Sequence, residues 1–262
     1  MTSCRLCGAS TIEVFRGTLL SKYDVAYFLC KGCGSLQTEA PHWLAEAYAE
    51  HNLAASDTGA ALRSLDCQAT VYAVARILRF RPDASILDFG GGSGLLCRHL
   101  RDCGFDAKLV DLYAANQFAQ GFDDDGGRFE IICAFEVAEH FSNPMSEMDR
   151  IFGRGARLCI FGTATYRDQG ADWWYLSPAS GQHVFFYSHR AMATLGAKYG
   201  YAYFRASDIH LFLDRTFTRS EAALLTYILN ARRLKWVRAY LALRASYANA
   251  SRDMQRAIGC AE

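Results

Sequence analysis

The chain has 262 residues, 51% of them hydrophobic, and a formal net charge of +1. This length and composition can bury the core of one large domain with an appendage, and the near-zero charge favours neither nucleic acid nor a membrane surface as a partner. The N-terminal MTSCRLCG has no basic-then-apolar signal, and no apolar run is long enough to span a bilayer. We therefore predict a cytoplasmic protein without a transmembrane segment.

Two short cysteine motifs open the chain, Cys4-Arg5-Leu6-Cys7-Gly8 and Cys30-Lys31-Gly32-Cys33-Gly34. Together they supply four thiolates, the number that a closed tetrahedral zinc site needs. The alternating apolar residues between the motifs predict short strands. We predict a zinc ribbon with one structural Zn²⁺ over residues 1–40. The alternative is two disulfides or free thiols, which a chain in a reducing compartment disfavours.

Residues 41–82 are expected to link this module to the next through two helices. The first covers 41–48. The second covers 62–78, where apolar residues recur with a period of 3.6. Arg63 at its start could reach a carboxylate of a bound cofactor, or could simply lie on a solvated helix face.

The next stretch, SILDFGGGSGLLCRHL over 85–100, predicts a buried strand, a tight turn and a helix. Its glycines allow a ligand to approach the backbone closely, and the helix N-terminus offers N–H groups to negative or polar ligand groups. The spacing does not fit the dinucleotide fingerprint, and no Walker lysine follows. The candidate ligand-binding residues of this turn are Asp88, Gly90, Gly91, Gly92 and Gly94.

A second apolar strand over 107–110 ends in Asp111. A carboxylate at this place can accept hydrogen bonds from the two vicinal hydroxyls of a ribose. The alternative is a solvated aspartate at the end of a strand. The loop 121–127 follows.

The apolar run 129–135 is typical of a central parallel strand and leads into Glu136, Glu139 and His140. In an open parallel sheet the carboxyl ends of the first and fourth strands form the ligand crevice, so these side chains are expected to face the reacting groups. His140 is a candidate general base because its ordinary pKa is near neutrality. A hydrogen-bonded structural histidine is the alternative.

A helix over 144–152 and a strand over 157–161 are expected next, followed by a long aromatic loop over 162–181. Trp173, Trp174 and Tyr175 in this loop could form a wall over an acceptor or simply pack the loop down. A helix over 191–199, capped by Ser188, and an antiparallel hairpin of 201–205 with 209–213 complete the sheet.

The segment 221–245 predicts one basic amphipathic helix. Such a helix could touch a membrane surface or an anionic substrate, but more often it packs on its own domain or on a second subunit. We predict packing or a homodimer through this helix.

Taken in order, DFGGGSG, Asp111, FEVAEHF and QHVFFYS resemble the motifs of class I S-adenosylmethionine-dependent methyltransferases, especially those of sugar and polysaccharide pathways. The resemblance implies an α/β Rossmann-like fold whose seven-stranded sheet is mostly parallel, with an antiparallel last strand. It implies S-adenosylmethionine as the cofactor, bound in a domain over 83–216, and a C-terminal helical segment over 217–262. It also implies cofactor contacts for Leu112, for Phe135, and for Phe122 and Asp123 near the adenine.

The same resemblance implies methyl transfer to a small polar acceptor, an oxygen of a sugar or nucleotide sugar, with His183 or His140 as base. In the related carbon-methylating enzymes a Tyr and a Glu stand where this chain has Ser180 and Gln182, so carbon methylation by that route is disfavoured. Two alternatives remain open. One is a metal-dependent 2′-O-methyltransferase of RNA, using Glu136, Glu139 and both histidines, although the absence of a strongly basic segment does not favour nucleic acid. The other is a non-catalytic scaffold with this fold.

Overall fold

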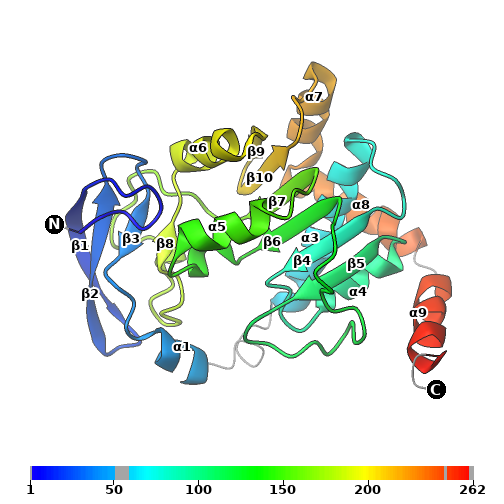
Figure 1. Ribbon diagram of the computed structural model, residues 1–262, viewed down its shortest axis with the longest axis horizontal. Coiled ribbons are helices and arrows are strands. Elements are labelled where there is room, and N and C mark those ends of the chain that lie inside the picture. Colours follow the sequence, from blue (N-terminus) through cyan, green and yellow to red (C-terminus); the bar gives the residue numbers. More distant parts are fainter. Residues whose placement is uncertain (1, 51–58, 245–246, 260–262) are drawn as a thin grey trace.

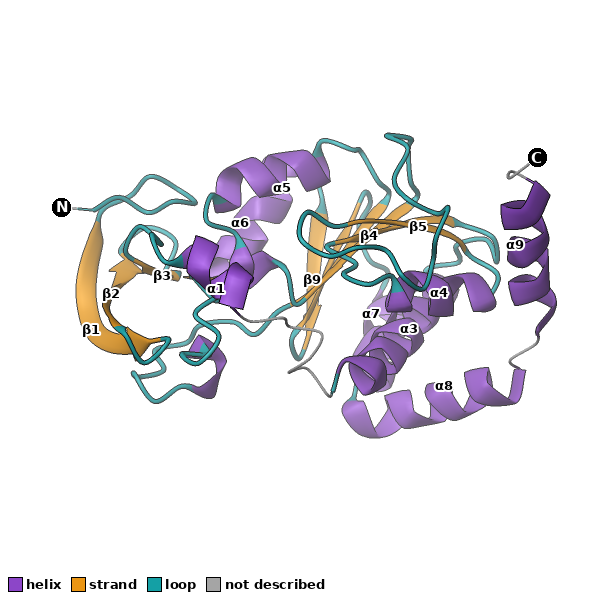
Figure 2. Cartoon of the chain, turned by 90° about the horizontal axis from the view of Figure 1, so that it is seen from below, coloured by secondary structure: helices purple, strands orange, loops and turns teal. Residues whose placement is uncertain are grey.

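The computed structural model describes residues 2–50, 59–244 and 247–259. These residues form an N-terminal module built on a four-stranded sheet and a larger domain built on a six-stranded sheet, which lie side by side (Figure 1). Helices cover both faces of the larger sheet (Figure 2). The structure therefore confirms the predicted α/β methyltransferase fold with an N-terminal cysteine module.

The six-stranded sheet has the order β5-β4-β6-β7-β10-β9. β4 pairs in parallel with β5 and β6, and β6 with β7. β10 runs antiparallel to both β7 and β9, which confirms the predicted closing hairpin. The strands are β4 (Ser85–Phe89), β5 (Asp106–Val110), β6 (Ile131–Phe135), β7 (Leu158–Gly162), β9 (Ala202–Ala206) and β10 (Ile209–Leu213).

This sheet has one strand fewer than the resemblance implies. Beyond β5, the described residues contribute only an isolated parallel bridge between Leu109 and Asp123. The segment 112–128 contains three consecutive aspartates and no alternating apolar run, so it has little to bury as an edge strand.

Alternate residues of the strands supply two cores, one on each face of the sheet. Ile86 belongs to a cluster with the helices α3 and α4, whereas Leu87 belongs to a cluster with α5 and α6. This period of two is the pattern of a strand buried on both faces. The helices are α3 (Ala60–Ile77), α4 (Leu95–Asp102), α5 (Pro144–Phe152) and α6 (His189–Tyr199).

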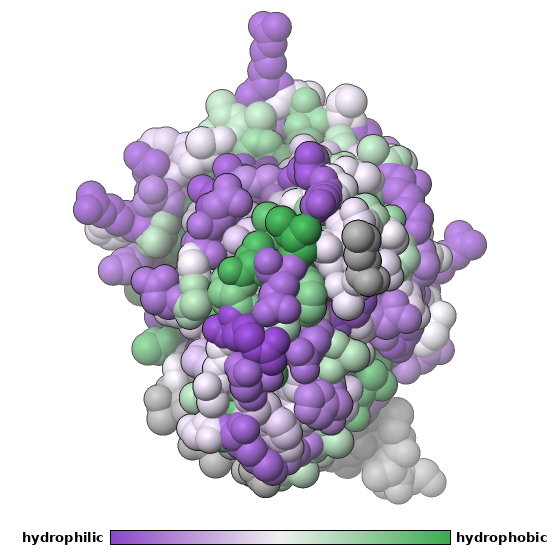
Figure 3. Space-filling view, turned by 90° about the vertical axis from the view of Figure 1, so that its left-hand side faces the viewer, coloured by the Kyte–Doolittle hydropathy of each residue, from purple (hydrophilic) through white to green (hydrophobic). Residues whose placement is uncertain are grey.

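The N-terminal sheet has the order β1-β2-β3-β8. β1 (Thr11–Leu19), β2 (Tyr23–Cys30) and β3 (Leu36–Thr38) come from the cysteine module, but β8 (Phe185–Phe186) comes from the segment that follows the aromatic loop. A short helix, α1 (Leu44–Glu50), follows β3. Figure 3 looks onto this end of the molecule and shows a small apolar area among polar side chains. Ile12 and Val14 of β1 are exposed.

The C-terminal segment is not the single helix that the periodicity predicts. It forms α7 (Arg219–Ile228), α8 (Ala231–Arg244) and α9 (Tyr247–Gly259), with a break at Leu229 and Asn230. α7 begins with a capping box formed by Thr218 and Glu221, and α8 packs along α3. No helix among the described residues combines the length and apolar character needed to cross a membrane.

Candidate functional site

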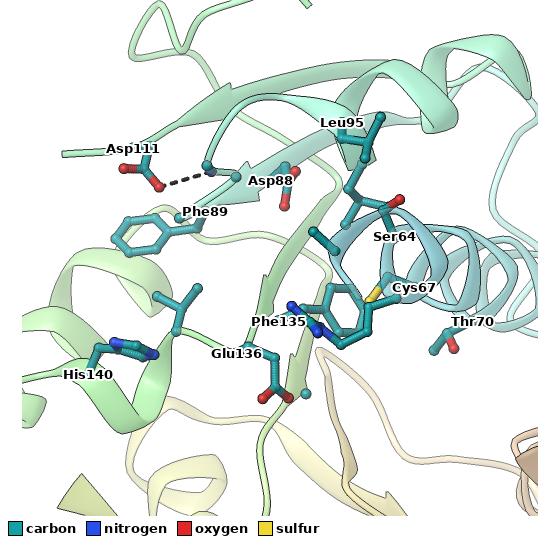
Figure 4. Close-up of a pocket in the computed structure, with 18 of the residues that line it drawn as sticks. Ser64, Cys67, Thr70, Asp88, Phe89, Leu95, Asp111, Phe135, Glu136 and His140 are labelled. Carbon is teal, nitrogen blue, oxygen red and sulfur yellow. Dashed lines mark hydrogen bonds between the residues drawn. The ribbon is translucent and has the colours of Figure 1, made fainter. Parts of the chain in front are cut away.

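A cavity of about 1410 Å³ opens at the carboxyl ends of β4, β5 and β6. Figure 4 shows α3, with Ser64, Cys67 and Thr70, as one wall, and the glycine turn with Asp88 and Asp111 at one end. Glu136 and His140 lie toward the opposite side of the close-up. Parallel sheets place their ligand crevices at this edge of the strands.

The backbone of the glycine turn leaves no room for a Cβ at two of its glycines, Gly90 and Gly94. Gly90 has φ +71°, and a Cβ there would lie 2.5 Å from a methyl carbon of Val137. Gly94, which precedes α4, has φ +87°, and a Cβ there would lie 2.6 Å from Asn116 Oδ1. Gly90, Gly91 and Gly92 all line the cavity, whereas Gly94 is buried behind them. A side chain at Gly90 would therefore disrupt the turn on which a ligand could rest.

Asp111 is held over this turn by backbone donors. Gly92 N–H donates to Oδ2 (2.9 Å), and the N–H groups of Tyr113 and Ala114 each donate to Oδ1 (2.8 Å; the first bond is dashed in Figure 4). Because a carboxylate oxygen accepts two hydrogen bonds, Oδ1 is fully used by these two donors, whereas Oδ2 keeps one acceptor position free. The carboxylate is thus preoriented to accept from a ribose hydroxyl through Oδ2.

Asp88 is 3% exposed, and its Oδ2 has no hydrogen-bond partner. Burial, together with the charge of Asp111, raises the pKa of Asp88 to about 7. A buried carboxylate oxygen such as Asp88 Oδ2 normally accepts a hydrogen bond, so a ligand in the cavity is expected to supply the donor. A cofactor that carries an ammonium group and ribose hydroxyls supplies donors, so Asp88, Asp111 and the open glycine turn fit such a group.

The remaining residues predicted to hold the cofactor divide into two pairs. Leu112, 68% exposed, and Phe135 line the cavity. Phe122 and Asp123 do not. The Phe122 ring lies 3.5 Å from the Arg101 guanidinium carbon and packs into the α3–α4 core, and Asp123 accepts from the Asn116 amide. The cation–π contact and burial draw Phe122 away from the cavity.

Glu136 and Glu139 lie together near the hydroxyl of Tyr175. That hydroxyl donates to Glu139 Oε1 (2.6 Å) and lies 3.5 Å from Glu136 Oε2. Glu139 is fully buried, and its Oε2 has no partner, whereas Glu136 lines the cavity in a strained conformation with φ +53°. Partial removal from water, with the charge of Glu139, raises the pKa of Glu136 to about 8. Strain at a cavity residue is typical of functional sites.

The two candidate bases lie beside these carboxylates, with their rings 4.9 Å apart. His140 lines the cavity, and its Nδ1 lies 3.2 Å from the Tyr48 hydroxyl. His183 lies behind it, with Nδ1 2.7 Å from the carbonyl oxygen of Tyr175. Since a carbonyl only accepts, His183 carries its proton on Nδ1 and leaves Nε2 as an acceptor. Burial lowers the pKa of both imidazoles, that of His140 to about 3.

The structure adds residues that the sequence did not single out. Tyr48 of α1 stacks on Tyr113 with ring centroids 4.3 Å apart, and both line the cavity. Tyr175, for which the sequence predicts only a place in a wall, contacts both Glu139 and His183 and is 2% exposed. Trp173 packs in the N-terminal core, and Trp174 is 77% exposed; neither lines the cavity. No local pattern marks these tyrosines, because their partners lie far away along the chain.

The four cysteines of the N-terminal module come together. Cys4 Sγ lies 3.8 Å from Cys33 Sγ, Cys7 Sγ lies 3.5 Å from Cys30 Sγ, and all four lie within 4.8 Å of one another. A tetrahedral Zn²⁺ with Zn–S bonds of about 2.3 Å separates its sulfurs by about 3.8 Å. None of the described cysteines forms a disulfide. The donor set therefore fits a structural zinc ion.

A family profile described as "Methyltransferase domain" matches residues 65–205, which includes the glycine turn, Asp111 and both candidate bases. The chain belongs to this methyltransferase family. Residues 65–205 are thus a methyltransferase domain of this family. No curated protein is significantly similar to the chain.

Solved structures of methyltransferases are similar to this methyltransferase. An O-methyltransferase family protein from Burkholderia thailandensis has 13% identity and a TM-score of 0.49, over 66% of this chain and 62% of that one. The 1,6-didemethyltoxoflavin-N1-methyltransferase of the same organism has 15% identity and a TM-score of 0.48, over 78% and 97%. The magnesium protoporphyrin IX methyltransferase of Synechocystis PCC 6803 has 14% identity and a TM-score of 0.44, over 66% and 93%. This chain thus spans about three fifths of the first of these proteins.

Proposed function

We propose that this methyltransferase transfers a methyl group from S-adenosylmethionine to a hydroxyl oxygen of a small acceptor, a sugar or a nucleotide sugar. The observation that carries the proposal is the cavity itself. It joins the glycine turn and Asp111, which suit the donor, to Glu136 and His140, which suit an acceptor hydroxyl. Both partners can therefore lie in one cavity.

In this proposal Asp111 Oδ2 accepts from a ribose hydroxyl, while the glycine turn and the unpartnered Oδ2 of Asp88 face the methionine part. Leu112 and Phe135 provide apolar contacts to the cofactor. The cofactor supplies an electrophilic methyl group when bound. The protein has to align the acceptor oxygen with it and remove the hydroxyl proton.

The proton passes to a neutral imidazole, that of His140 or His183. His140 is the one that lines the cavity, and burial keeps its ring neutral. The same burial disfavours the imidazolium, so proton transfer to His140 requires nearby groups that stabilise this charge. His183 has the fixed tautomer that leaves Nε2 unprotonated. A carboxylate oxygen of Glu139 lies within 4.8 Å of ring nitrogens of both histidines, and Glu136 acts on His183. When ionised, these carboxylates stabilise the imidazolium that forms. Gln182 takes no part, because it is buried and its amide donates to the carbonyl oxygen of Ala47 (3.1 Å).

The first experiment measures cofactor binding. Calorimetry with S-adenosylmethionine and S-adenosylhomocysteine should show one site per chain, and a panel of nucleotide sugars with methyl-labelled cofactor should then identify a labelled acceptor. Absence of cofactor binding would refute the proposal. Binding without label in any acceptor, together with unchanged behaviour of histidine variants, would favour the scaffold alternative.

One observation favours a second candidate. Ligand atoms of Glu139, His140 and His183 lie within 4.8 Å of one another, and Glu139 Oε2 has no partner. A divalent cation at this place would make the protein a metal-dependent 2′-O-methyltransferase of RNA, with the histidines as ligands rather than as bases. Transfer that survives EDTA while the ribbon keeps its zinc would reject this candidate. Transfer to RNA that is lost with EDTA and restored by a divalent cation would support it.

A further inference from the structure

The strand that follows His183 belongs to the sheet of the N-terminal module (Figure 1). In β8, Phe186 pairs with Leu36 and Phe185 with Gln37 of β3. The side chains of this segment alternate between two clusters. Phe186 packs with the module alone, whereas Phe185 lies in the cluster that joins Cys4, Cys30 and Cys33 to the core of the larger domain. The cysteine module and the candidate catalytic segment thus share one sheet.

The first cysteine motif contacts the residue directly after His183. Arg5 lies between Cys4 and Cys7, and its Nη2 donates to the carbonyl oxygen of Val184 (2.5 Å). The N–H of Thr38 donates to the same carbonyl (3.1 Å), while the N–H of Val184 donates to the carbonyl oxygen of Glu139 (2.8 Å). The backbone N–H and C=O of Val184 therefore connect the cysteine motif to the carboxylate–histidine cluster.

The second cysteine motif holds the other end of the segment. The hydroxyl of Ser188 donates to the carbonyl oxygen of Cys33 (2.5 Å), and its N–H donates to Ser35 Oγ (3.2 Å). The same hydroxyl caps α6 by accepting from Ala191 N–H. Both motifs thus bond to the 183–188 segment, one beside each end.

We propose that the zinc-loaded ribbon positions His183, and that Arg5 is the positioning residue through which the first cysteine motif acts. The inference rests on the proposed function, because it assigns the ribbon a role in the acceptor end of the same site. Zinc holds each motif in the conformation that presents Arg5 to Val184 and the Cys33 carbonyl to Ser188. Loss of the ion releases both contacts, whereas among the described residues no hydrogen bond joins the glycine turn or Asp111 to the ribbon.

The test compares Arg5→Met with Arg16→Met in the full chain. Arg16 is an arginine of the same module, but it is exposed and pairs with Asp24 and Glu13. It lies on β1, at the opposite edge of the sheet from β8. The readouts are zinc per chain, amide hydrogen exchange of peptides covering 182–189 and 85–100, and the imidazole NMR signals of His183. A hydrogen bond from a charged donor is being removed, so we expect exchange in 182–189 to rise about tenfold in Arg5→Met only. Zinc content should stay at one ion.

A second measurement removes zinc from the unmodified chain with a mercurial thiol reagent. Exchange in 182–189 and the His183 signals should then change by at least as much as in Arg5→Met, while 85–100 stays protected. Unchanged exchange and unchanged His183 signals after zinc removal, or equal effects of both arginine variants, would overturn the inference. If Arg5→Met does not fold, the same exchange and NMR measurements on Arg5→Lys and on the zinc-free chain test the inference. Failure of S-adenosylhomocysteine to bind would refute the proposed function and leave these exchange results standing.

Discussion

Substituting Asp111 tests the donor half of the site most directly. In the Asp111→Asn variant the side chain keeps its shape but loses its charge, and one oxygen becomes an NH₂ group. Both carboxylate oxygens accept from backbone N–H groups, at 2.8 to 2.9 Å. The amide NH₂ must therefore face an N–H donor in either orientation.

The expected loss follows from these contacts. A hydrogen bond to a charged group contributes about 1.5–3 kcal/mol, which corresponds to roughly 10- to 150-fold in affinity. We expect the dissociation constant for S-adenosylhomocysteine, measured by calorimetry, to rise by that factor in Asp111→Asn and more in Asp111→Ala. Asp123→Asn is the matched control, because Asp123 is a nearby aspartate that does not line the cavity.

The control should bind within about twofold of the unmodified chain. If Asp111→Asn also binds within that range while remaining folded by circular dichroism, Asp111 does not hold the ribose, and the assignment of this cavity to the cofactor loses its main support. If Asp123→Asn weakens binding as much as Asp111→Asn, the adenine lies where the sequence placed it, and the loop 121–127 must move on binding.

Three further changes have defined outcomes. Gly90→Ala should lower the melting temperature and abolish cofactor binding, because its Cβ would meet Val137 at 2.5 Å and φ is +71°; binding as in the unmodified chain would refute this. The folded protein raises the pKa of Asp88 to about 7 from an ordinary 3.8, so ionising this carboxyl destabilises the fold. The destabilisation is absent at low pH and increases as the pH rises from 4 to 7. Asp88→Asn should therefore be stabilised more at pH 8 than at pH 5 in urea titrations, and an equal effect at both would contradict the argument. Asp253→Asn weakens the bidentate pair with Arg101 (2.7 and 2.9 Å), so limited proteolysis should release α9 sooner than in the unmodified chain.

The parts of the site that were predictable from sequence are those made within one or two elements. The strand, turn and helix around Gly90 are encoded by a contiguous pattern, and Asp111 follows the neighbouring strand directly. Their meeting needs only the parallel pairing of β4 with β5, which adjacent strands in a βαβ unit adopt. The cysteine cluster is equally local, since each half is a four-residue motif.

What the sequence could not supply depends on contacts between distant residues. The resemblance predicts Phe122 near the adenine, whereas in the structure its ring lies against the Arg101 guanidinium and an apolar core, which belong to other elements. Tyr48 reaches His140 across 92 positions, and Arg5 reaches Val184 across 179. No periodicity reports such pairings.

The C-terminal error has a different cause. The apolar pattern of 221–245 continues through Leu229 and Asn230, so periodicity alone does not mark an end. In the structure, however, Asn230 starts a new turn: its side chain accepts from Arg232 N–H. An asparagine offers its own backbone an alternative to the helix, and here this local bond wins over the propensity of the flanking residues.

Because β8 lies about 150 residues after β3, its strand partner, the N-terminal sheet cannot be completed early in synthesis. During synthesis the cysteine motifs and β1–β3 emerge first, but β3 pairs on its outer side with residues that emerge about 150 positions later. Until then the backbone of β3 has an unpaired edge. Leu36, which is fully buried in the complete fold, is then partly exposed because Phe186 does not yet pack beside it. A fragment cut after residue 40 would keep that open edge permanently. We therefore expect the excised ribbon to self-associate even with its zinc in place, whereas a ribbon covalently joined to a copy of the 182–189 strand should remain monomeric.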